Sequence, residues 1–121
     1  MIKRLPPELA CTYCGLATTG VDHVPPKCVR STLLQLPVDR IPKFVEVSCC
    51  RECNSALGHM PLWTVPERKA YIKQWLKRRY GHYLELPHWA EDELDELGPT
   101  LRQYVESGGK VAELIRARLR W

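Results

Sequence analysis

An acidic side chain and an imidazole stand next to each other at Asp22 and His23, in the segment GVDHVPPKC that spans residues 20–28. Two prolines follow. Because proline fixes its own φ and restricts the residue before it, the pair leads into a stiff turn that should hold both side chains in place. A carboxylate oxygen is a hard ligand that suits Mg²⁺, and an imidazole can take a proton from an attacking water. The pair therefore carries two of the groups that metal-assisted hydrolysis of a phosphodiester needs.

The six cysteines are the strongest clue in the composition. Four of them form two C-x-x-C pairs, a spacing that suits a tetrahedral zinc site with four deprotonated sulfur ligands. The predicted zinc ligands are Cys11, Cys14, Cys50 and Cys53. Gly15 supports this interpretation, since a zinc knuckle turns sharply and glycine tolerates the turn. Cys28 and Cys49 are expected to pack as small apolar residues, and Cys49 would replace Cys50 as a ligand only with an unusual spacing.

The distance between the two pairs indicates that something is inserted into the zinc-binding unit. Segment 15–49 is longer than the ~15–20 residues of a plain zinc ribbon, and it contains Asp22 and His23. Asn54 directly follows the last cysteine, so one zinc ion would bring the Asp-His pair and Asn54 onto neighbouring loops. An amide oxygen is a hard ligand like a carboxylate oxygen. Outside this context, an Asp-His pair before a proline usually forms a turn with an Asx-type hydrogen bond. Asn54 could likewise simply cap the knuckle turn.

Together, these motifs resemble a known family. A C-x-x-C pair, a DH dipeptide with proline close behind it, and a C-x-x-C-N sequence that opens a helix are similar to the HNH, or ββα-metal, endonucleases. The likeness is to the zinc-stapled branch that includes phage recombination endonuclease VII, and it covers residues 11 to about 60. It implies an α+β fold with a β-hairpin followed by a helix. It also implies cutting of nucleic acid to leave 5′-phosphate and 3′-hydroxyl ends.

The resemblance further implies a role for each site residue. Asp22 and Asn54 would bind a catalytic Mg²⁺ or Mn²⁺, and His23 would act as the general base. Many HNH proteins carry a middle asparagine that orients the base, but Asn54 is the only asparagine in this chain. The alternating segment KFVEVS (residues 43–48) is expected to be the second hairpin strand. A backbone carbonyl or Ser48 on that strand could orient His23 instead.

His59 lies on the short helix that Asn54 opens, five residues further along the chain. Gly58 and Pro61 mark the end of that helix. We therefore expect His59 to be a surface or helix-end histidine and not a member of the site.

A longer helix is expected from about Val65 to Tyr80, because Thr64 and Glu67 form a capping box with a proline in the first turn. One side of it is apolar, with Ile72, Trp75 and Leu76, and another side carries Lys69, Lys73 and Lys77. These cations could form a solvated face or could follow the phosphates of a nucleic acid, and the sequence favours neither. Lys27 and Arg51 flank the site and are the expected local phosphate contacts.

Three shorter helices are expected beyond this one. The first starts with the acidic residues 91–93 and ends at Gly98-Pro99. The second holds residues 101–105 and stops at Gly108-Gly109, and the third runs from about Lys110 to Arg120. The third would bury Val111, Leu114, Ile115 and Leu119, while Arg116, Arg118 and Arg120 could add phosphate contacts.

Length and composition limit the possible domain organisation and the possible partners. A chain of 121 residues suits one domain (1–121), in which a zinc-stapled core (11–60) precedes a helical extension (61–121). No apolar run is long enough to cross a bilayer, and the N-terminal segment has no signal-peptide core. We therefore expect a soluble, cytoplasmic protein without a membrane partner. The net charge of +4 permits a polyanion as partner without requiring one.

The leading hypothesis is a Mg²⁺- or Mn²⁺-dependent HNH endonuclease that acts on DNA and carries a structural Zn²⁺. Many family members act as dimers, so a homodimer is a further expectation. The alternative is a non-catalytic zinc module that binds nucleic acid or a protein partner. A redox protein that uses its C-x-x-C pairs ranks below both, because the βαβ context of such motifs is missing.

Overall fold

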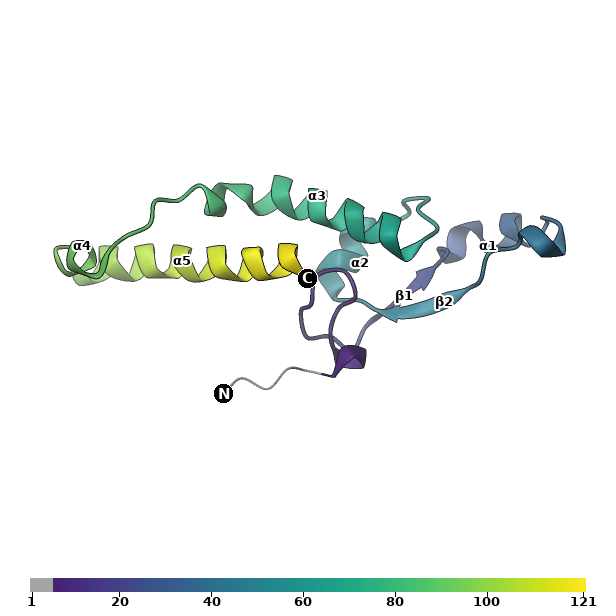
Figure 1. Ribbon diagram of the computed structural model, residues 1–121, viewed down its shortest axis with the longest axis horizontal. Helices are drawn as coiled ribbons and strands as arrows, with labels where there is room; N and C mark the ends of the chain where they lie inside the picture. Colours follow the sequence, from purple (N-terminus) through teal and green to yellow (C-terminus); the bar gives the residue numbers. More distant parts are fainter. Residues whose placement is uncertain (1–5) are drawn as a thin grey trace.

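The computed structural model describes residues 6–121, in which two strands and a short helix lie at one end of two long helices (Figure 1). Residues 1–5, which begin the predicted domain and the segment searched for a signal peptide, lie outside the described residues. This arrangement confirms the α+β class, with a strand pair followed by helices. The elements are η1 (Pro7–Leu9), β1 (Val21–Val24), α1 (Lys27–Leu33), η2 (Val38–Arg40), β2 (Val45–Ser48), α2 (Arg51–Leu57), α3 (Val65–Leu84), α4 (Glu91–Asp95) and α5 (Pro99–Arg120).

β1 and β2 form an antiparallel pair in which His23 lies opposite Glu46. Side chains alternate between the two faces of a strand, so Asp22 and Val24 are buried while His23 lies on the more open face. The predicted second strand within residues 43–48 is confirmed. α1 and η2 occupy the connection between the strands, so the pair is joined by a long excursion instead of a tight turn.

α3 begins where its capping box predicts. Thr64 Oγ1 accepts a hydrogen bond from the backbone nitrogen of Glu67 at 3.3 Å and donates one to the Glu67 carboxylate at 2.7 Å. The helix continues about one turn beyond its predicted end. Ile72 and Leu76 are fully buried, which confirms the predicted apolar side.

The last long helix differs from the prediction. α5 passes through Gly108 and Gly109 without interruption, so the predicted break there is wrong. A glycine inside a helix costs about 1 kcal/mol relative to alanine, and packing outweighs this cost here. A Cβ atom on Gly108 would lie 3.2 Å from Leu86 Cδ1, so the absent side chain lets α5 pass close to the segment that follows α3.

The buried side of α5 also differs in part. Ala112 and Ile115 are buried, and Arg118 continues the same side at a spacing of three residues. Leu114 lies off that side and is 48% exposed, so its predicted burial is wrong. An arginine therefore occupies a core-facing position at the end of the helix.

The hydrophobic core surrounds the cysteines. The buried residues packed there include Tyr13, Leu57, Ile72 and Leu76, and Leu119 of α5 packs partly buried against them. The core thus joins the first knuckle, α2, α3 and the end of α5. Within residues 6–121, no helix combines the length and the apolar character that crossing a membrane requires.

Candidate functional site

Four buried cysteines meet where the two C-x-x-C loops face each other. One sulfur from each lies within 4.8 Å of all the others, and the Cys14 and Cys50 sulfurs are 3.6 Å apart. Ligand sulfurs in a tetrahedral zinc site are separated by about 3.8 Å, given Zn–S bonds of about 2.3 Å, whereas disulfide sulfurs lie about 2.05 Å apart. The cluster therefore has the chemistry and the geometry to hold a zinc ion. Its members are the predicted ligands Cys11, Cys14, Cys50 and Cys53.

Local backbone structure positions each loop. Gly15 has a φ of +78°, which confirms the predicted sharp turn, and its nitrogen donates to the Cys11 carbonyl at 2.9 Å. A Cβ atom on Gly15 would lie 2.6 Å from Cδ2 of Trp121, so the turn also leaves room for that indole ring. On the second loop, Cys50 is the N-cap of α2, and its sulfur accepts a hydrogen bond from the backbone nitrogen of Cys53.

The two remaining cysteines behave differently from each other. Cys49 is buried, as expected, and lies outside the four-sulfur cluster. Cys28 is exposed, so the expectation that it packs in the core is wrong. It lies in the first turn of α1, where it lines a small cavity next to the strand pair.

Asp22 is held in a buried network. Arg68 of α3 donates from Nε to Oδ2 and from Nη2 to Oδ1 of Asp22, both at 2.8 Å, and the Tyr13 hydroxyl donates to Oδ2 at 2.5 Å. Burial, and then the bond to Asp22, raises the pKa of Tyr13 far above its usual range, so the phenol keeps its proton. A carboxylate offers about four acceptor positions, and these bonds occupy three of them. One position on Oδ1 remains.

His23 has a partner on the neighbouring strand. Its Nε2 atom lies 3.0 Å from Oε1 of Glu46, the residue directly opposite it. Ser48, which the sequence suggested for this place, instead donates its hydroxyl to the Glu8 carbonyl. With Nε2 engaged by a carboxylate, the tautomer assigned to His23 carries its proton on Nε2 and leaves Nδ1 free to accept one.

A small cavity of about 220 Å³ brings the predicted site residues together. Asp22 and His23 line it from β1, and Asn54 lines it from α2. Lys27 also lines it, whereas the predicted phosphate contact Arg51 is exposed at the start of α2 and is not part of the lining. The cavity thus combines a carboxylate, an imidazole, an amide and an ammonium group.

His59 and Arg68 line the same cavity, so the expectation that His59 lies apart from the site is wrong, and the sequence analysis did not place Arg68 there. His59 is exposed, as expected, but it returns to the site because Gly58 ends α2 with a φ of +48° and redirects the chain. Arg68 comes from α3, which packs against α2 and α5, and its long side chain reaches Asp22 of β1. Glycine at the end of the short helix was the one usable indication of the position of His59.

The comparisons with known proteins found no match: no family model, no curated protein and no solved structure is similar to this chain. The interpretation of the cavity therefore depends on its own residues and on the motifs in the sequence.

The basic side of α3 lies partly open. Lys69 donates from Nζ to the backbone oxygen of Trp121 at 2.9 Å, whereas Lys73 is half-buried and Lys77 exposed. Within residues 6–121, neither Lys73 nor Lys77 forms a salt bridge. On α5, Arg118 is buried, so its predicted contact with phosphate is wrong.

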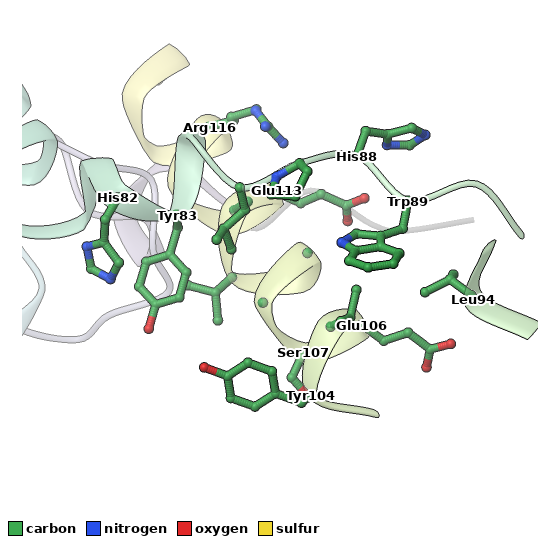
Figure 2. A pocket seen from close by; sticks show the side chains of 17 residues that line it. His82, Tyr83, His88, Trp89, Leu94, Tyr104, Glu106, Ser107, Glu113 and Arg116 are labelled. Atoms are coloured by element: carbon green, nitrogen blue, oxygen red, sulfur yellow. The ribbon is translucent and has the colours of Figure 1, made fainter. Parts of the chain in front are cut away.

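A larger cavity of about 680 Å³ lies between the end of α3, α4 and α5 (Figure 2). Aromatic side chains line it, among them Tyr83, Trp89 and Tyr104. Within residues 6–121, the only group of His, Cys, Asp and Glu side chains close enough to share a metal ion is the four-cysteine cluster, which lies elsewhere. Of the two cavities, only the smaller one contains residues from the predicted site.

Proposed function

We propose that the protein is an HNH-type endonuclease that hydrolyses phosphodiester bonds in DNA with a divalent metal ion. The observation that carries the proposal is the shared cavity of Asp22, His23 and Asn54. These residues come from β1 and α2, and they meet beside a four-cysteine cluster. Strand pair, short helix and cysteine cluster together would form a ββα-metal core.

In this proposal the cysteine cluster holds a structural Zn²⁺. The two knuckles lie far apart in the sequence, and a zinc ion bound by both would fix α2 relative to the strand pair. Such metal binding contributes directly to the folding free energy. The zinc ion would therefore position the site without taking part in the chemistry.

His23 would act as the general base. The Glu46 carboxylate lies 3.0 Å from Nε2 and would hold the N–H on that atom, which leaves the Nδ1 lone pair to take a proton from the attacking water. Glu46 would thereby orient His23, a role that the middle asparagine has in many HNH proteins and for which this chain has no asparagine.

Asp22 and Asn54 would bind the catalytic Mg²⁺ or Mn²⁺. Asp22 offers the remaining acceptor position of Oδ1, and Asn54 offers its amide oxygen. When bound, the ion would stabilise negative charge on the phosphate and on the leaving 3′ oxygen. Arg68 fixes the direction of the Asp22 carboxylate, because it donates to both carboxylate oxygens.

Cationic side chains would bind the DNA backbone. Lys27 lies in the cavity itself, and Arg51 stands exposed on the first residue of α2. The lysines of α3 would extend this contact along the duplex. A homodimer would offer two such sites to one DNA molecule.

A second candidate function is a non-catalytic zinc module that binds nucleic acid or protein. The observation that favours it is the Asp22–Arg68 pair: both side chains are nearly fully buried, and the carboxylate already has three hydrogen-bond donors. In this alternative Asp22 serves the fold, and the cavity binds no catalytic metal.

Nicking of supercoiled plasmid DNA separates the two candidates. The zinc-loaded protein should nick DNA with Mg²⁺ or Mn²⁺ and should lose this activity in EDTA. His23→Ala should lower the rate by roughly 10²–10⁴-fold, the usual contribution of a positioned base. His88→Ala removes an exposed histidine outside the small cavity and should cleave normally.

Asn54→Ala tests binding of the catalytic metal more directly than a change at Asp22 does. Asn54 is exposed, so its loss should raise the metal concentration required while the fold persists. Loss of Asp22 would leave Arg68 charged, buried and unpaired, at a cost of about 3–5 kcal/mol. Metal-dependent nicking by His23→Ala at the rate of the unchanged protein would refute the proposed role of His23 in catalysis. The non-catalytic binding module would then be the remaining candidate.

A further inference from the structure

We propose that Arg118 belongs to the metal centre as a positioning residue that stabilises the zinc-bound thiolates of Cys14 and Cys53. The inference rests on the proposed zinc site but not on nuclease activity. It assigns the end of α5 a role in metal retention that none of the sequence motifs indicates.

The geometry of Arg118 carries the inference. Its side chain is only 4% exposed, and Nη2 lies 3.4 Å from the Cys14 sulfur and 4.0 Å from the Cys53 sulfur. Nη1 forms an ion pair with Oε1 of Glu52 at 2.6 Å. Glu52 in turn accepts a hydrogen bond from the Tyr80 hydroxyl. One edge of the guanidinium is thus fixed by α2 and α3, and the other edge points at two of the four sulfurs.

Charge explains why an arginine occupies this buried position. Four thiolates around one Zn²⁺ carry a net charge of −2, and burying such a charge is costly unless hydrogen bonds and opposite charges compensate it. Arg118 supplies a positive charge and an N–H donor within the core. Its Nε atom has no hydrogen-bond partner among the described residues. The buried guanidinium is therefore compensated on Nη1 by Glu52 and on Nη2 by the cysteine sulfurs.

Neighbouring contacts of α5 act on the same knuckle. Leu119 packs against the cysteine core, and the ring of Trp121 lies against Gly15. The Trp121 backbone oxygen accepts a hydrogen bond from Lys69 of α3. The last turn of α5 therefore covers the first knuckle, and this cover should slow the release of a bound zinc ion.

The test is the rate at which zinc-loaded full-length protein transfers its zinc to the chromogenic chelator 4-(2-pyridylazo)resorcinol. Arg118→Met keeps the length of the side chain but removes charge and donors, and it should release zinc about 10–100-fold faster, the usual effect of losing a residue that supports metal ligands. Arg118→Lys should lie between. Arg116→Met, an exposed change on the same helix, should release zinc at the unchanged rate.

Cobalt substitution separates this role from mere packing. A hydrogen bond to a thiolate lowers the energy of its lone pairs, so Arg118→Met should move the sulfur-to-cobalt charge-transfer band to longer wavelength. Ile115→Ala, which weakens the packing of α5 without touching a sulfur, should leave the band in place. If Arg118→Met does not fold, Arg118→Lys should show the same shift with smaller size.

Two results would overturn the inference: zinc release at the unchanged rate from both Arg118 variants, or a charge-transfer band that does not move in either. If the purified protein retains no zinc at all, the proposed zinc site itself is refuted. The experiments therefore distinguish failure of the Arg118 proposal from failure of the zinc-site proposal.

Discussion

His23 and Glu46 belong to different strands, and the antiparallel register of β1 and β2 places them directly opposite each other. Cross-strand neighbours of this kind are close enough for side chains to interact. Their 3.0 Å contact engages Nε2 of the imidazole, so Nδ1 is the nitrogen that would act on a bound substrate.

Glu46→Ala tests this role at the scale of one residue. We expect the single-turnover rate of plasmid nicking to fall by about 10–100-fold, as when a functional histidine loses its orienting partner. The dependence on metal concentration should be unchanged, since Glu46 does not line the cavity. Glu85→Ala, which removes an exposed carboxylate at the end of α3, is the matched control. Equal rates for both variants would show that Glu46 does not orient His23.

The residue scale also shows what could be predicted. The sequence analysis offered a backbone carbonyl or Ser48 on β2 as the group that orients His23, and Ser48 lies two residues from Glu46 on the same face of the strand. A slip of two residues preserves the face, so alternation alone cannot fix the register after a long connection. The Asp22–Arg68 pair joins residues 46 apart in the chain, and it depends on how α3 packs. No local pattern contains that information.

At the scale of the elements, α3 combines two tasks on different sides of one helix. Ile72 and Leu76 pack into the core, while Lys73 and Lys77 lie on other sides without a salt-bridge partner in the described part of the chain. Lys69 already donates to Trp121. If this side of α3 follows a DNA backbone, two lysines are free to contact phosphates.

Replacing Lys73 and Lys77 by glutamine should lower DNA affinity and reduce the slope of log K against log salt by about 1.8, since each duplex phosphate contact contributes ~0.9. The change leaves the buried side of α3 intact, so the fold should persist. The control is the double replacement of Lys43 and Lys110 by glutamine, which changes the net charge equally at two exposed positions outside α3. If the two double variants have equal slopes of log K against log salt, the α3 lysines do not contact DNA and form an ordinary solvated side of the helix.

Prediction of the elements succeeded where local chemistry dominates. Thr64 and Glu67 mark the start of α3, and the core positions Ile72 and Leu76 follow from apolar spacing. It failed at Gly108, where glycine serves close approach to Leu86 and does not end the helix. Sequence alone does not distinguish a glycine that breaks a helix from one that lets a neighbour come near.

At the scale of the whole molecule, the cysteine cluster connects segments from every part of the described chain. Cys11 and Cys14 come from its beginning, Cys50 and Cys53 from its middle, and Arg118 from its end. The pairing of the knuckles was predictable, because C-x-x-C spacing is a property of the sequence. The contribution of Arg118 was not, because a basic residue near the end of a helix ordinarily lies in solvent.

Removing one of the proposed zinc ligands should therefore affect the entire fold. Cys50→Ser should lose zinc and most of its helical circular dichroism, because metal binding and folding are one equilibrium in so small a core. Cys28→Ser changes an exposed cysteine and should keep both one zinc per chain and its unfolding temperature. The measurements are metal analysis and thermal unfolding followed by circular dichroism. Equal losses from the two changes would undo the assignment of the ligands.

Arg118 lies 104 residues after Cys14 and 65 residues after Cys53. A ribosome that adds about 5–20 residues per second therefore completes the set of four cysteines roughly 3–13 s before it adds Arg118. Until α5 is complete, thiols that have left the ribosome lack the contacts that Arg118 and Trp121 make in the folded chain. If the cluster binds zinc as proposed, the order of residues along the chain would let a metal ion bind the four sulfurs before α5 encloses them.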